Sequence, residues 1–191
     1  MDAAGYTTLT RQSGLMREMQ VVANNIANIS TTGFRREGVV FEEYIAKTPD
    51  GPSLSMASGD GRVIDLTQAG ISQTGGAFDL AIQGDGFFQV QTPDGPRLTR
   101  AGNFTPSPTG ELVTNDGYRL MDDGGAAIVL PPGATKIAVA QDGTLSADGA
   151  PVAHIGLWQP GDPLSLQHQA GTMFSADSVQ PATGGVIMQG Y

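Results

Sequence analysis

The residues best suited to chemistry in this chain are acidic, because it contains 19 Asp and Glu, two His and no Cys. Carboxylates in glycine-rich loops can bind Ca²⁺, but no segment has the spacing of an EF-hand loop or of a tandem calcium-binding repeat. Asp-Gly is also a preferred pair for two-residue hairpin turns. We therefore interpret the Asp-Gly pairs as turns, and expect no metal site. They begin at Asp50, Asp60, Asp85, Asp94, Asp116, Asp123, Asp142 and Asp148.

Other catalytic patterns are weaker still. We interpret His154 as a solvent-facing strand residue and His168 as a loop residue, and there is no G-x-S-x-G motif. Gly84-Asp85-Gly86 begins like a dinucleotide fingerprint, but Gln89 stands where the third glycine belongs and no helical pattern follows. We expect no catalytic residue, no cofactor and no small-molecule substrate.

Composition excludes several classes of partner. The formal net charge of −9 argues against nucleic acid or an anionic membrane surface. The sequence contains no run of about 18 apolar residues, so we expect no membrane insertion. The N-terminus also lacks the pattern of a secretory signal peptide. Arg35-Arg36 is the only pair of adjacent basic residues, and we interpret it as a solvated pair just past a helix end.

An amphipathic helix is predicted from about Ala3 to Ile29. Its apolar residues recur every seven positions in three rows, which are Leu9, Met16 and Ala23, then Met19 and Ile26, then Leu15, Val22 and Ile29. Burying six of the large side chains would contribute on the order of 10 kcal/mol as an upper bound, so this side of the helix needs a partner. Ser30 to Thr32 favour a stop, and Gly33 is predicted to adopt the positive φ of a C-terminal cap.

The remainder of the chain reads as β structure. Gly reaches 27 and Pro 12, and the spaced Asp-Gly pairs separate short β-prone runs at 78–83, 87–92, 97–100, 118–121, 137–140 and 152–158. We divide the chain into a helical segment (1–34), an extended arm and linker (35–61), a β-rich domain (62–178) and a return segment (179–191). The fold class is mainly β with an N-terminal helix, the β part being an irregular sandwich or barrel of short hairpins.

Several motifs together carry a family resemblance. The segment 23–28 reads ANNIAN and is followed by Thr32-Gly33-Phe34-Arg35. The segment 78–90 reads FDLAIQGDGFFQV and is followed by LTRAGNF at 98–104, GEL at 110–112, DGY at 116–118 and DGTL at 142–145. In this order they resemble the bacterial flagellar axial proteins, the family of rod and hook subunits. The chain most resembles the proximal-rod subunit, because it has no room for a hook subunit's outer domain and lacks the distal-rod pattern after Phe34.

The resemblance implies a structural role. In this family a terminal helix, paired with a C-terminal helix, forms the inner tube of the axis, and the β-domain forms the outer wall. The implied location is the basal-body rod, which crosses the periplasm. The implied partners are other rod subunits, copies of itself or homologous axial proteins, and the flagellar type III export apparatus, with no cleaved signal peptide. In the family a Gly-Tyr or Gly-Phe leads into the C-terminal helix, whereas this chain ends at Gly190-Tyr191, so we expect a fragment whose partner helix is missing.

We therefore predict a non-enzymatic subunit that polymerises through its helix. The assembly residues are Leu9, Leu15, Met16, Met19, Val22, Ala23 and Ile26 for helix packing, with Asn24, Asn25, Asn28, Gly33 and Phe34 at the helix exit. The asparagines are equally well interpreted as a recognition face or as a solvated face. We assign Gly84, Gly86, Gly102 and Gly117 to turns. The alternatives are a distal-rod or hook-type axial subunit and, in a different class, a secreted calcium- or glycan-binding β-protein.

Overall fold

A computed structural model describes residues 3–46 and 54–191. The chain divides into two compact units. The helix–hairpin unit consists of Met1–Ser30 and Arg35–Leu66, and the β-rich unit consists of Thr31–Phe34 and Thr67–Tyr191. The short segment between Ser30 and Arg35 therefore belongs to the β-rich unit, although helix–hairpin residues flank it on both sides.

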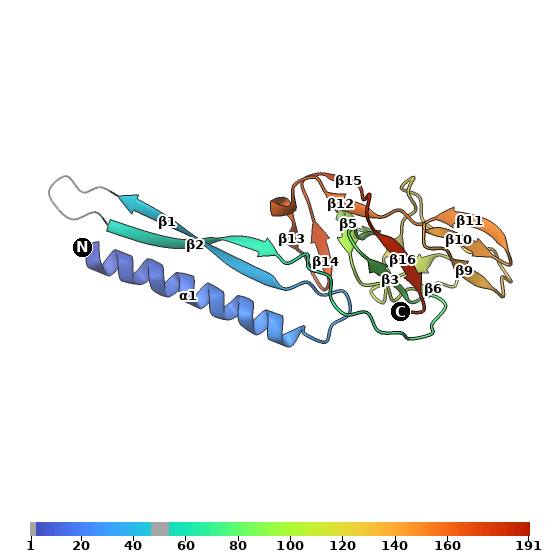
Figure 1. Ribbon diagram of the computed structural model, residues 1–191, viewed down its shortest axis with the longest axis horizontal. Coiled ribbons are helices and arrows are strands. Elements are labelled where there is room, and N and C mark those ends of the chain that lie inside the picture. Colours follow the sequence, from blue (N-terminus) through green and yellow to red (C-terminus); the bar gives the residue numbers. More distant parts are fainter. Residues whose placement is uncertain (1–2, 47–53) are drawn as a thin grey trace. The chain divides into compact units, whose positions relative to one another are not determined.

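The helix–hairpin unit begins with α1 (Ala3–Ala27), which confirms the predicted helix (Figure 1). The helix ends where its hydrogen bonds tighten: Asn28 N still donates to Asn24 O four residues back, but Ile29 N donates to Ile26 O only three residues back. A three-residue bond closes a narrower turn than the α-helix, so the regular helix ends at Ala27 and residues 28–30 form a turn. No described helix is long and apolar enough to cross a membrane.

A two-stranded antiparallel hairpin completes this unit. Strand β1 (Glu37–Ala46) pairs with β2 (Leu54–Ile64) from Glu37↔Ile64 to Ala46↔Leu54, with a register shift between Val40 and Glu42. The predicted extended arm and linker (35–61) is not a linker from Leu54 onward, where the chain forms β2, and residues 47–53 lie outside the described part of the chain. Gly61 of the Asp60-Gly61 pair lies inside β2 opposite Val40, because pairing with β1 outweighs the local turn preference.

The β-rich unit contains four sheets, the largest with seven strands. Their order is β13 (Gln167–His168), β14 (Met173–Ser175), β5 (Gly95–Thr99), β4 (Phe88–Thr92), β8 (Arg119–Leu120), β7 (Leu112–Val113) and β6 (Thr105–Pro106). The smaller sheets are β9 (Ile137–Val139) with β10 (Thr144–Ala147) and β11 (Ala150–His154), β12 (Trp158–Pro160) with β15 (Val179–Pro181), and β3 (Leu80–Gln83) with β16 (Val186–Gln189). A 3₁₀ turn, η1, spans Pro163–Ser165. In the described residues these sheets form no closed barrel.

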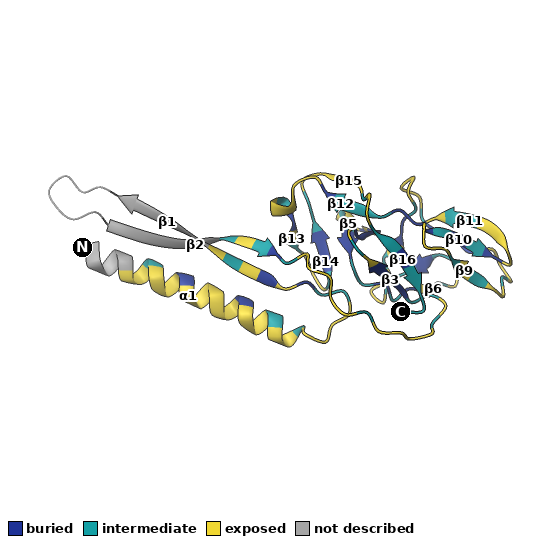
Figure 2. Ribbon diagram, viewed as in Figure 1, coloured by how far each residue is buried: buried dark blue, intermediate teal, exposed yellow. Residues whose placement is uncertain are grey.

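One apolar core holds the sheets of this unit together (Figure 2). Phe88, Val90 and Leu120 of the large sheet are fully buried, as is Leu145 of β10. Phe88 meets Phe104 edge to face, with ring centroids 5.4 Å apart. Short strands contribute few ladder hydrogen bonds each, so burial in this shared core supplies most of the stability of the unit.

The hairpin turns follow the Asp-Gly pairs in most of this unit. At the turn from β10 to β11 both Asp148 (φ 51) and Gly149 (φ 86) have positive φ, as a type I′ turn requires. Among the four glycines assigned to turns, Gly84, Gly86 and Gly117 have positive φ. Gly102 does not: a Cβ there would lie 1.5 Å from Leu80 O, so this glycine permits a close backbone approach instead.

Candidate assembly surface

The apolar side of α1 is open to solvent in the isolated chain. We call it the apolar stripe; it consists of Leu9, Leu15, Met16, Met19, Val22, Ala23, Ile26 and Ile29. The large side chains among them are between 48% (Val22) and 85% (Ile29) exposed. Single exposed apolar residues are ordinary on protein surfaces, but a continuous helical row of this length is typical of an interaction surface, so the stripe is the candidate assembly surface.

The hairpin packs on the opposite side of α1. Gly14 and Val21 are buried and Asn25 is half-buried, while the stripe residues are all exposed. At about 100° per residue, the middle of the stripe lies about 140° around the helix axis from the middle of this covered face. Both hairpin strands contact α1. The helix thus has one face used within the unit and one face unused.

The three asparagines at the end of α1 have two different roles. Asn25 Nδ2 donates to Glu37 O (2.9 Å), and Glu37 N donates to Asn25 Oδ1 (3.0 Å). Asn28 Nδ2 instead donates to the backbone and side-chain oxygens of Asn24, at 3.0 Å and 2.9 Å. Asn25 is therefore committed to a contact within the unit, whereas Asn24 remains exposed.

Charged side chains gather where the hairpin begins. Arg35 and Glu37 are buried, with Arg62 Nη1 3.8 Å from the Glu37 carboxylate. Burial lowers the pKa of Arg35, and the nearby Asp65 carboxylate partly offsets this effect. Arg36 is exposed and bonds to Asp65. The interpretation of Arg35-Arg36 as a solvated pair is thus wrong for Arg35.

The exit segment, Thr31–Phe34, is fixed within the β-rich unit. Gly33 has φ +76, and a Cβ at this position would lie 2.2 Å from Ala101 N. The Phe34 ring stacks on His168 at 5.4 Å between centroids, and His168 lies 4.4 Å from the Phe174 ring. Gly33 has the predicted positive φ but lies six positions after the last residue of α1, so it does not cap the helix. His168 belongs to strand β13 and not to a loop.

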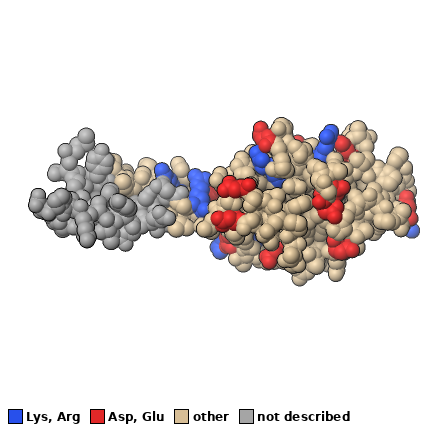
Figure 3. All heavy atoms as spheres, turned by 90° about the horizontal axis from the view of Figure 1, so that it is seen from above, with Lys and Arg blue, Asp and Glu red and all other residues tan. Residues whose placement is uncertain are grey.

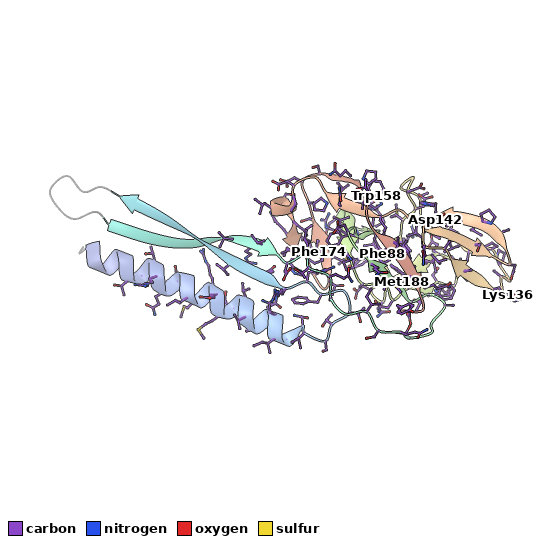
Figure 4. All side chains as sticks on the ribbon, in the orientation of Figure 1. Phe88, Lys136, Asp142, Trp158, Phe174 and Met188 are labelled. Carbon is purple, nitrogen blue, oxygen red and sulfur yellow. The ribbon has the colours of Figure 1, made fainter. Side chains whose placement is uncertain are left out.

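Two of the carboxylates that suggested a cation site accept hydrogen bonds from nearby backbone and hydroxyl groups instead. Asp142 accepts from Thr144 N (2.9 Å), and Asp148 Oδ1 accepts from Lys136 N (2.9 Å) and Thr135 Oγ1 (2.9 Å). These hydrogen bonds lower the pKa of both carboxyl groups. In the described part of the chain no three His, Cys, Asp or Glu side chains are grouped as metal ligands. Figure 4 shows Lys136 at the end of the β-rich unit that holds β9, and Figure 3 shows acidic groups spread over the visible face of that unit.

Two of these contacts have no signal in the local sequence. The pairing of Asn25 with Glu37 joins residues 12 positions apart, and the stack of Phe34 on His168 joins residues far apart in the chain. The ANNIAN motif marked Asn25 as unusual but could not distinguish it from Asn24. Nothing in the residues around His168 predicted an aromatic stack.

Comparison with known proteins covers both units. Residues 6–35 match the family model described as flagella basal body rod protein, and residues 81–147 match the flagellar hook protein FlgE/F/G D1 domain. The chain is 40% identical to the flagellar basal-body rod protein FlgF of Caulobacter vibrioides, over 100% of this chain and 80% of that protein. It is 40% identical to FlgF of Rhizobium meliloti over 83% of this chain and 66% of that protein. It is 34% identical to the rod protein FlgG of Bacillus subtilis over 74% of this chain and 59% of that protein.

Proposed function

The chain belongs to the family of flagellar basal-body rod proteins, and we propose that it builds the rod by packing the apolar stripe of α1 against helices of neighbouring axial subunits. It is a structural subunit of the basal body, and its partners are other axial subunits. The single observation that carries the packing proposal is the exposure of the stripe on the face of α1 that the hairpin leaves free.

The finer placement is also a proposal. The chain is 38% to 40% identical to relatives named FlgF and 32% to 37% identical to relatives named FlgG, which supports the FlgF type. We assign it to the proximal rod, where the axis crosses the periplasm. We also propose that the chain is exported through the flagellar type III apparatus without a cleaved signal peptide. We further propose that it acts without catalysis.

The stripe has the chemistry of a helix–helix seam. Its large residues are Leu, Met, Val and Ile, and the residue row that contains Met19 and Ile26 runs along its middle. Fully burying each such side chain contributes about 1.5 to 3 kcal/mol, so a partner that covers the stripe gains on the order of 10 kcal/mol before the entropic cost of association. A helical partner of matching periodicity supplies that coverage best.

The experiment introduces Ile26→Asp into the chromosomal gene and measures the protein in purified basal bodies by quantitative mass spectrometry, normalised to another rod subunit. Gln20→Asp is the matched control, because Gln20 is exposed and lies outside the stripe. We expect loss of incorporation and swimming with Ile26→Asp and near-normal behaviour with the control. Equal incorporation of the two variants would contradict packing through the stripe, and absence of the unmodified protein from basal bodies would contradict the rod assignment.

A further inference from the structure

The side chain of Asn25 pairs with the backbone of a hairpin residue. A primary amide carries one donor and one acceptor in the same plane, which is the arrangement of a peptide group in a β-ladder. Asn25 offers Nδ2 to Glu37 O and Oδ1 to Glu37 N, at 2.9 Å and 3.0 Å. Glu37 is the first residue of β1 and already faces Ile64 of β2 in the register. Asn25 therefore covers the edge of β1 that β2 does not.

From this geometry we infer that Asn25 is a positioning residue that holds the start of the β1–β2 hairpin on one face of α1 and so helps to determine which face remains free for assembly. The consequence for assembly rests on the proposed function, but the contact itself does not. Only a side chain with both a donor and an acceptor satisfies Glu37 on this edge. Gly14 and Val21 line the same covered face but offer no directional bond that could set the register.

The surroundings of Asn25 favour an amide over a carboxylate at position 25. The Glu37 side chain is buried, and its carboxylate has Arg62 Nη1 at 3.8 Å. An aspartate at position 25 would keep an acceptor for Glu37 N but would turn a second oxygen toward Glu37 O and add a negative charge near a buried carboxylate. Loss of a donor from a part-buried pair leaves the partner carbonyl unsatisfied.

The neighbouring residue supplies a matched control. Among the contacts of the described residues, the exposed Asn24 uses its side chain as an acceptor from Asn28 Nδ2 (2.9 Å), and aspartate retains that acceptor. The same substitution at adjacent positions therefore removes a needed donor in Asn25→Asp and preserves the existing contact in Asn24→Asp. Both variants introduce one negative charge in the same turn of the helix.

The test is hydrogen exchange with mass spectrometry on the full chain, with peptides that cover the start of β1 and the end of β2. We expect about tenfold faster exchange or more at Glu37–Val40 in Asn25→Asp, and unchanged exchange in Asn24→Asp. Peptides over β4 of the β-rich unit report whether each variant is folded. Equal exchange of the two variants at the hairpin overturns the inference.

A second measurement addresses assembly. We expect Asn25→Asp to reach basal bodies less than Gln20→Asp, which adds a charge at an exposed position outside the stripe, when each replaces the chromosomal gene. If exchange rises but incorporation equals that of the control, the hairpin contact is real and its role in selecting the assembly face is refuted. Failure of the rod assignment would look different, because the unmodified protein would then be missing from basal bodies while the exchange difference persisted.

Discussion

The substitution Met19→Glu tests the apolar stripe most directly. Met19 is 72% exposed and lies at the middle of the stripe, so the isolated chain tolerates a charge there. Glutamate and methionine have similar helix propensity, and an exposed substitution usually changes stability by less than about 0.5 kcal/mol. The helix content and unfolding midpoint of the purified chain should therefore stay close to those of the unmodified protein.

The effect on assembly is much larger. Met19 has 72% of its surface left to bury, and full burial of methionine contributes about 1.5 to 3 kcal/mol, so the substitution forfeits about 1 to 2 kcal/mol. Placing an unpaired carboxylate in the same contact adds a penalty of several kcal/mol. A combined loss of about 4 kcal/mol weakens the contact about 1,000-fold.

The assay compares purified basal bodies from strains carrying Met19→Glu, Met19→Leu and Gln20→Glu. Gln20 is exposed and lies outside the stripe, so Gln20→Glu introduces the same residue one position away. Met19→Glu should be absent from basal bodies, and the other two should incorporate. If Met19→Glu incorporates as well as Gln20→Glu while circular dichroism shows both helices intact, the stripe is not the assembly surface.

Three further predictions concern the β-rich unit. Its unfolding in urea can be followed by the fluorescence of Trp158. Gly33→Val should destabilise the unit by about 3 kcal/mol, because valine is strained at positive φ and its Cβ would collide with Ala101 N. Phe34→Ala should lower its stability by about 2 kcal/mol through loss of the half-buried ring stacked on His168. The depressed pKa of Asp148 stabilises the folded state above the ordinary carboxyl pKa, and this contribution disappears as pH falls through the lowered value. In Asp148→Asn the loss of stability on acidification should be smaller.

The controls for these variants are available in the same unit. Gly75 has φ +78, and a Cβ there would meet no atom within 4 Å beyond its chain neighbours, so Gly75→Val carries the backbone strain without the collision. It should cost about 1 to 2 kcal/mol, and an equal cost at Gly33 would contradict the close approach to Ala101. Phe34→Leu retains apolar volume but not the stack.

The parts of the fold that were predictable depend on short-range signals. Residues 3–27 repeat apolar positions at helical spacing, so the helix could be predicted to within two residues of its end at Ala27, although the predicted cap at Gly33 is wrong. The turn at Asp148-Gly149 needs two consecutive residues with positive φ, a requirement that these residue types satisfy locally. Such features need no knowledge of the rest of the chain.

The parts that failed depend on distant partners. Strand β2 includes Ser58, Gly59 and Asp60, which have low strand preference, and it forms because β1 pairs with it along most of its length. Gly102 resembles a turn glycine in the sequence, but it is needed because Leu80 O lies too close for a Cβ. His168 resembles a loop residue in the sequence, but in the structure the ring of Phe34, which is far away in the chain, stacks on it.

The two faces of α1 contribute unequally, and this inequality bears on how the helix functions. Among the described residues of α1, Val21 is the one large apolar side chain that is buried; Gly14 adds no side chain and Asn25 adds two hydrogen bonds. These three residues together contribute a few kcal/mol, whereas full burial of the stripe would contribute on the order of 10 kcal/mol. Covering the stripe would therefore stabilise the helix more than these contacts do. In the proposed assembly, the hairpin contact orients α1, and the stripe supplies the energy of association.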